Sequence, residues 1–134
     1  MRRNGATLNG QLSRIISETG HTDLIVVTDA GLPIPRNVER VDLAYRPGVP
    51  AFLDVLDTVL AELVIEGVTA ASEIAETSPA ILSELHRRFD PLGVAITLVP
   101  HTEFKQLSLG ARAAVRSGEF TPYANVILHA GVAY

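Results

Sequence analysis

The chain has 134 residues, of which 47% are hydrophobic, and it contains no cysteine. This size and composition predict a single globular domain over residues 1–134, and they exclude disulfides and thiolate metal sites. The net charge of −4, with no basic run longer than two residues, disfavours nucleic-acid and anionic-membrane partners. No apolar run has membrane-spanning length and no signal peptide is visible at the N-terminus, so we expect a cytoplasmic protein.

Predicted helices and strands alternate along the chain. Apolar residues at helical spacing predict helices over residues 8–19, 50–63, 79–89 and 102–116. Short apolar and β-branched runs predict strands at 23–28, 41–44, 64–70, 94–99 and 126–129. This order predicts an α/β fold, a three-layer sandwich with a largely parallel central sheet flanked by helices.

Two ionisable residues come just after predicted strands. Asp29 follows the strand at 23–28, and His101 follows the strand at 94–99. Ligands of open α/β sheets bind beyond the carboxyl ends of the strands, so both residues are candidates for ligand binding. The structural alternatives are a turn capped by the Asp29 carboxylate and a loop histidine that precedes a helix. Both interpretations stay open for each residue.

His21 lies between the first predicted helix and the strand that follows it. Its imidazole can exchange a proton near neutral pH, which makes His21 a candidate general acid. A histidine at the end of a helix is also favoured by the helix dipole. From this residue alone, the structural role is the favoured one.

A polar loop at residues 116–125 precedes the last predicted strand. Tyr123 and Asn125 are two residues apart, so their side chains would point the same way in an extended segment. A phenol and a carboxamide can each donate and accept hydrogen bonds, which suits the recognition of hydroxyl groups. Packing under a loop and closing a turn are the structural alternatives. Lys105 lies one helical turn after His101 and is an additional candidate for contact with a substrate oxygen.

Motifs of the common cofactor sites are absent from the sequence. There is no glycine-rich dinucleotide or phosphate loop, no Gly-x-Ser-x-Gly elbow, and no histidine spacing typical of a metal site. We therefore expect neither a cofactor nor a metal.

Several short motifs together resemble the ribose pyranase and fucose mutarotase family. They are Gly20-His21-Thr22-Asp23, the segment 29–35, Gly48-Val49-Pro50, and the segments 101–105, 116–119, 122–125 and 130–132. The resemblance covers essentially the whole chain and is weakest over residues 71–93. The sequence Ala-Gly-Leu-Pro-Ile-Pro after Asp29 favours the ribose branch of the family.

The resemblance implies an intramolecular isomerase that interconverts the pyranose and furanose forms of free D-ribose without a cofactor. It also implies a homo-oligomeric ring, typically a decamer, with active sites at subunit contacts. In this chain it assigns proton donation to His21 and sugar binding to Asp29, His101 and the segment Tyr123-Ala124-Asn125. Either Asp29 or His101 is then the candidate base.

Some roles remain open beside this assignment. Lys105 and Glu119 are additional candidates for substrate contact. A mutarotase acting on another monosaccharide such as fucose, an aldose–ketose isomerase, and a non-catalytic sugar-binding or regulatory module are the alternative functions.

The positions of His21 and Asp29 pose a geometric problem. The two residues are eight positions apart across a predicted strand, and a straight strand would separate them by about 26 Å at about 3.3 Å per residue. They could not then share one ribose within one chain. We expect either a bend in the chain or a pocket to which two subunits contribute.

Overall fold

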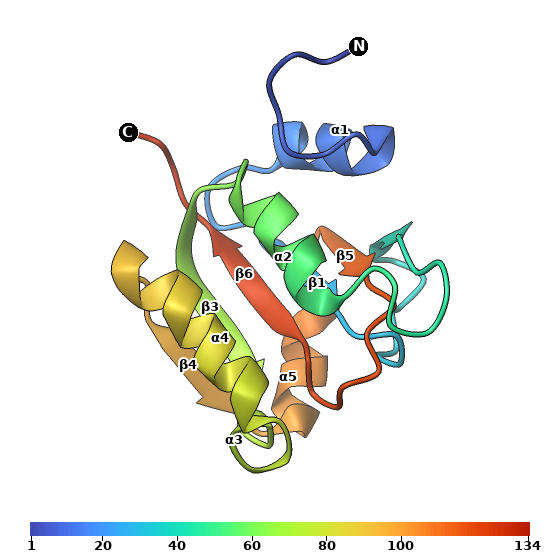
Figure 1. Cartoon of the computed structure of the whole chain (residues 1–134). Coiled ribbons are helices and arrows are strands. Elements are labelled where there is room, and N and C mark those ends of the chain that lie inside the picture. Colours follow the sequence, from blue (N-terminus) through green and yellow to red (C-terminus); the bar gives the residue numbers. More distant parts are fainter.

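A six-stranded sheet lies between two layers of helices in the computed structural model, which describes residues 1–134 (Figure 1). The strands are β1 (Leu24–Thr28), β2 (Glu39–Asp42), β3 (Ile65–Ala71), β4 (Ile96–Val99), β5 (Ala113–Arg116) and β6 (Val126–Ala130). The helices are α1 (Gly10–Glu18), α2 (Phe52–Leu60), α3 (Ile74–Thr77), α4 (Pro79–Phe89) and α5 (His101–Ser108), with a short 3-10 helix at Asp90–Leu92. None of the helices combines the length and hydrophobicity needed to cross a membrane.

The strand order is β2-β5-β1-β6-β3-β4, and β6 is the one strand that runs against its neighbours. The other five strands share one direction, so the prediction of an α/β sandwich with a largely parallel sheet is confirmed. Because β6 is reversed, its first residue lies at the edge of the sheet where the other five strands end. Segments that precede β6 and segments that follow β1 or β4 therefore meet at this edge, which we call the carboxyl edge.

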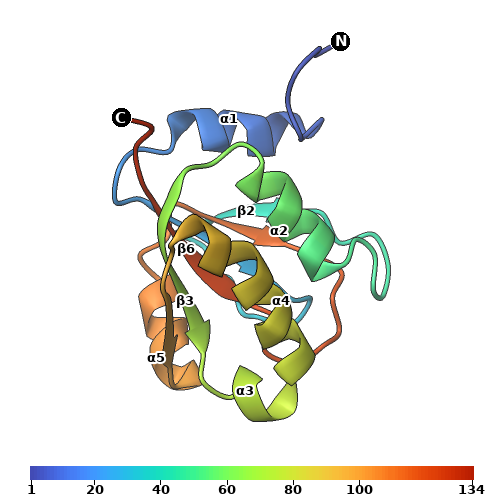
Figure 2. The same cartoon turned by 60° about the vertical axis from the view of Figure 1, so that its left-hand side comes forward.

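The two faces of the sheet are covered unequally. Helices α1 to α4 pack on one face and enclose a core of 20 buried residues, whereas α5 covers the other face above a cluster of 8. Figure 2 shows α5 on the opposite side of the sheet from α2 and α4. Alternate residues of a strand supply the two cores, as β1 illustrates: Ile25 and Val27 face the larger core and Val26 the smaller.

The predicted helix over 102–116 is wrong in its second half. Helix α5 ends at Ser108, the chain turns, and Ala113–Arg116 form β5 between β1 and β2. Alanine is a good helix former, but β5 is hydrogen-bonded on both sides within the sheet, and this tertiary pairing outweighs local propensity. The other predicted helices and strands are present with ends that differ by a few residues, and α3 was not predicted.

Candidate functional site

A pocket of about 270 Å³ opens at the carboxyl edge of the sheet. Its lining residues come from the ends of β1, β4 and β6, and they are Asp29, Gly31, Leu32, Pro33, His101, Pro122, Tyr123 and Asn125. Four of the predicted site residues therefore meet in one pocket: Asp29, His101, Tyr123 and Asn125. The reversal of β6 explains how Asn125, which precedes β6, reaches Asp29, which follows β1.

Asn125 and Asp29 hold each other in place at the floor of this pocket. The Asn125 Oδ1 accepts the backbone N–H of Asp29 at 2.8 Å, and the Asn125 Nδ2 donates to the Asp29 Oδ2 at 3.0 Å. The Asp29 Oδ1 accepts the backbone N–H groups of Gly31 at 2.9 Å and Leu32 at 2.8 Å. The carboxylate thus caps a turn, as one interpretation of the sequence predicted. Since Oδ1 already accepts two hydrogen bonds and Oδ2 only one, Oδ2 has room for a further donor.

The segment after β5 fixes the turn that carries Asp29. Ser117 donates from both its backbone N–H and its hydroxyl to the carbonyl oxygen of Thr28, at 3.0 and 2.6 Å. The backbone N–H of Ala30 donates to the carbonyl oxygen of Glu119 at 2.8 Å. The backbone on both sides of Asp29 is therefore tied to the neighbouring chain segment.

Glu119 lies beside the pocket, and its carboxylate is already hydrogen-bonded. It accepts a backbone N–H at the start of α2 at 3.2 Å and the hydroxyl of Thr121 at 3.1 Å. It lines an adjoining cavity of about 380 Å³ that shares Asp29 with the pocket. The nearby Arg116 forms its ion pair with Asp42, at 3.1 Å.

His101 begins α5, and its ring is enclosed by aromatic side chains. The ring stacks on Phe104 with centroids 6.2 Å apart and meets Tyr123 edge-on at 5.1 Å. Its Nδ1 is buried and has no hydrogen-bond partner. Nε2 is therefore the ring nitrogen that is left to contact a ligand, and an imidazole nitrogen can take part in hydrogen bonding there.

Glu73, which sequence analysis missed, anchors the start of α5. Both of its carboxylate oxygens accept the backbone N–H of His101, at 3.0 and 3.1 Å. Loss of solvent raises the pKa of the Glu73 carboxyl, but hydrogen bonds from its own N–H and from that of His101 outweigh this and lower the pKa below its ordinary value. The position of Glu73 just beyond the end of β3 is the sequence signal that could have drawn attention to it.

The segment that carries Tyr123 and Asn125 forms a turn, so the expectation of an extended segment is wrong. Tyr123 has a φ of 61°, which is rare for a bulky residue, and this conformation accompanies the edge-on contact of its ring with His101. Ala124 is fully buried in the larger core and does not line the pocket. Its backbone N–H donates to the carbonyl oxygen of Thr121 at 3.4 Å.

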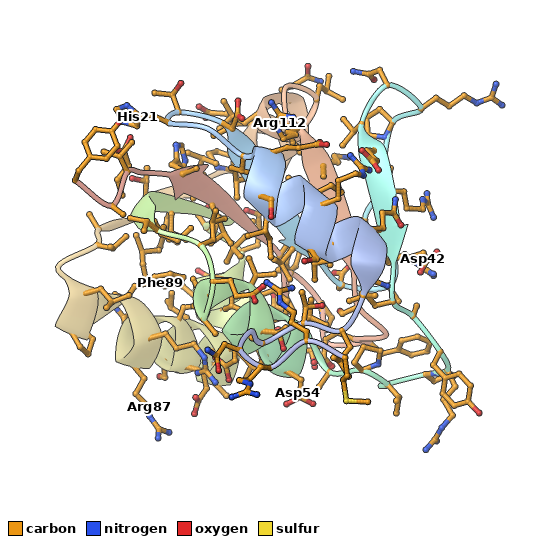
Figure 3. The ribbon with its side chains drawn as sticks, turned by 90° about the horizontal axis from the view of Figure 1, so that it is seen from above. His21, Asp42, Asp54, Arg87, Phe89 and Arg112 are labelled. Atoms are coloured by element: carbon orange, nitrogen blue, oxygen red, sulfur yellow. The ribbon has the colours of Figure 1, made fainter.

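His21 lies at the opposite edge of the sheet from the pocket, in the loop between α1 and β1. Figure 3 shows it at the periphery of the molecule. Its Nε2 is 3.1 and 3.0 Å from the two carboxylate oxygens of Glu66 on β3, and both side chains are about half exposed. The length of β1, five residues or about 17 Å, separates His21 from Asp29. The chain does not bend to bring His21 into its own pocket.

Two further features that the sequence analysis considered are Lys105 and the possibility of a metal site. Lys105 is exposed on α5 and does not line the pocket. No group of three or more histidine, cysteine, aspartate or glutamate side chains is arranged to hold a metal ion.

Two curated relatives match this chain closely. The D-ribose pyranase of Laribacter hongkongensis is 54% identical over 134 residues, which is the whole of both chains. The D-ribose pyranase of Symbiobacterium thermophilum is 53% identical over 127 residues, or 95% of each chain.

Solved structures and a family model also match this chain. The structure of Bacillus subtilis RbsD complexed with D-ribose has a TM-score of 0.95 and 43% identity over the whole of both chains. FucU from Bifidobacterium longum shares the fold with a TM-score of 0.79 and 24% identity, over 95% of this chain and 97% of that one. A model of the RbsD / FucU transport protein family matches residues 1–133. The chain therefore belongs to the RbsD / FucU transport protein family.

Proposed function

We propose that this chain is a D-ribose pyranase, an isomerase that interconverts the pyranose and furanose forms of free D-ribose in the cytoplasm. The observation that carries the proposal is the pocket in which Asp29, His101, Tyr123 and Asn125 converge. Its volume of about 270 Å³ lies just below the usual range for drug-sized ligands, which suits a molecule as small as a pentose. The 54% identity to a D-ribose pyranase and the TM-score of 0.95 to a ribose-bound relative support it.

The reaction requires only proton transfers. A proton is delivered to the ring oxygen as its bond to C1 breaks, and another is removed from the anomeric hydroxyl, which leaves the open-chain aldehyde. A different hydroxyl then attacks C1 and loses its proton, while the aldehyde oxygen gains one. Positioned acid and base groups typically accelerate such steps by about 10²–10⁴-fold.

Asp29 is the proposed base, and His101 is a proposed hydrogen-bond partner of the sugar. The Asp29 Oδ2 is the carboxylate oxygen with room for the anomeric hydroxyl. The buried Nδ1 of His101 leaves Nε2 as the nitrogen that can form a hydrogen bond with a sugar hydroxyl. Asn125 and Tyr123 then hold the remaining hydroxyls, and Ala124 contributes by its backbone alone.

His21 is the proposed acid, and it serves the pocket of another copy. Within one chain, β1 separates His21 from the pocket. A homo-oligomer, proposed as a decameric ring, places the His21 edge of one copy against the carboxyl edge of its neighbour. Glu119 lines the cavity next to the pocket, and Lys105 is exposed on the helix that begins with His101, so both remain additional candidates in that assembly.

Backbone strain supports the importance of both edges. Thr22 and Tyr123 are the two non-glycine residues with a positive φ, at 72° and 61°. One directly follows His21 and the other lines the pocket. Such conformations cost about 1–3 kcal/mol and are concentrated at functional sites.

Exchange NMR on D-ribose tests the proposal. We expect catalytic amounts of the protein to accelerate exchange between the pyranose and furanose signals, and we expect L-fucose to be a poorer substrate. Deuterium at C2 after incubation in D₂O would instead identify an aldose–ketose isomerase. Ribose binding without faster exchange would identify a non-catalytic module and contradict the proposal.

A further inference from the structure

We infer that Glu66 is the positioning residue of His21, because its carboxylate binds Nε2 and leaves Nδ1 as the nitrogen that exchanges a proton with the sugar. This inference rests on the proposed function. It assigns a role in the reaction to a residue that lies outside the pocket and whose sequence context gave no signal.

The geometry of the pair is well defined. The Nε2 of His21 lies almost equally far from both Glu66 oxygens, at 3.1 and 3.0 Å, so both oxygens are within hydrogen-bonding distance of this nitrogen. Glu66 comes from β3 and His21 from the loop before β1, 45 residues earlier in the chain. The contact therefore depends on the fold and is not a local pairing within one helix or turn.

The end of β6 fixes both partners. The backbone N–H of Thr22 donates to the carbonyl oxygen of Ala130 at 3.0 Å, which pins the loop that carries His21. Gly131 follows, and a Cβ there would lie 3.3 Å from the Cβ of Glu66 and 3.4 Å from its Oε2. A larger residue would therefore press on the Glu66 side chain, and glycine leaves it free to face His21.

The pairing determines which nitrogen of His21 does chemistry. With Nε2–H donated to Glu66, the protonated ring presents Nδ1–H, which passes its hydrogen to the sugar ring oxygen as the bond from that oxygen to C1 breaks. The neutral ring keeps its hydrogen bond to Glu66. On reclosure, Nδ1 takes the proton of the attacking hydroxyl, and Asp29 returns its proton to the oxygen on C1. The cycle leaves every group as it began.

We expect Glu66 to contribute by orienting the His21 ring rather than by stabilising the fold. Side-chain exposures of 52% for His21 and 47% for Glu66 mean that water screens the attraction of the pair, and exposed pairs add little to stability. A variant of Glu66 should therefore fold normally. The chain offers a matched control in His86 and Asp90 on and just after α4, which are 3.0 Å apart and similarly exposed.

The test is a double-mutant cycle with exchange NMR. Glu66→Ala should lower kcat by about 10-fold, a typical cost of losing a positioning contact, with KM unchanged. Glu66→Gln keeps an acceptor for Nε2–H and should recover most of kcat. In a His21→Ala background, Glu66→Ala should have no further effect, because the ring it orients is gone. Asp90→Ala should exchange ribose at the wild-type rate, and melting temperatures confirm that each variant folds.

The outcomes separate this inference from the proposed function. If the wild-type protein accelerates exchange but Glu66→Ala has an unchanged kcat, Glu66 is not a positioning residue. If Glu66→Ala lowered kcat by the same factor in the wild-type and in the His21→Ala background, the inference would also be overturned, because Glu66 would then act independently of that ring. If the wild-type protein does not accelerate exchange at all, the proposed function fails and the inference fails with it.

Discussion

The two edges of the sheet differ in how complete they are. At the carboxyl edge, Asn125 is 1% exposed and clamps Asp29, whose carboxylate accepts three hydrogen bonds. At the opposite edge, His21 has a single side-chain partner and is half exposed. The first edge carries the pocket in which four predicted site residues meet, whereas the second carries an imidazole that lies outside that pocket. This difference is the basis of the proposal that one chain supplies the binding half of a site and a neighbouring copy supplies the acid, His21.

The largest expected effect comes from His21. His21→Gln should lower the exchange rate by about 10²-fold or more, since it removes the proposed acid. Binding of ribose, measured by calorimetry, should be nearly unchanged, because the pocket residues are intact. His86→Gln serves as the control. A variant that loses binding together with exchange would contradict the division between the two edges.

A smaller effect is expected at the floor of the pocket. Asn125→Ala leaves the backbone N–H of Asp29 without its acceptor and removes the donor to Oδ2. A buried group without a partner costs about 1–3 kcal/mol, so the free energy of unfolding should fall by that amount and ribose binding should weaken. Denaturant unfolding and calorimetry measure the two quantities. Asn37→Ala, at an exposed position, is the control, and an equal change in both variants would mean that the clamp contributes nothing.

The smallest effect concerns Glu73 and depends on pH. Its pKa is lowered in the folded state from an ordinary value of 4.5, so its stabilisation is fully present above pH 4.5 and is lost as pH falls through the lowered pKa. The melting temperature of Glu73→Gln should therefore lie below that of the wild type at neutral pH, and the two should converge in acid. A difference that grows in acid would show that the carboxylate does not stabilise α5.

The sequence predicted the layers of the fold better than the direction of its last strand. Apolar periodicity located most elements, and alternation of helices and strands predicted a largely parallel sheet. Periodicity contains no information on strand direction, so the reversal of β6 was not predicted. The Ala113–Arg116 segment was misassigned for a related reason, since its place between two strands is decided by pairing with distant residues.

The candidate site was predicted in parts. Asp29 and His101 were found because residues after parallel strands line ligand sites, and the structure places both in the pocket. Tyr123 also lines it, but through a turn with positive φ that composition cannot predict. Glu66 and Glu73 were missed because each acts through a contact with a residue far away in the chain.

Mixed assemblies of two inactive variants test most directly whether two copies share one site. His21→Gln and Asp29→Asn each inactivate the homomeric protein, but in a random co-assembly about one quarter of the sites combine an intact pocket from one copy with an intact His21 from another. We predict that the co-expressed mixture recovers about one quarter of the wild-type exchange activity, with mixed assemblies confirmed by mass spectrometry. Mixed assemblies as inactive as either variant alone would contradict a site built from two copies.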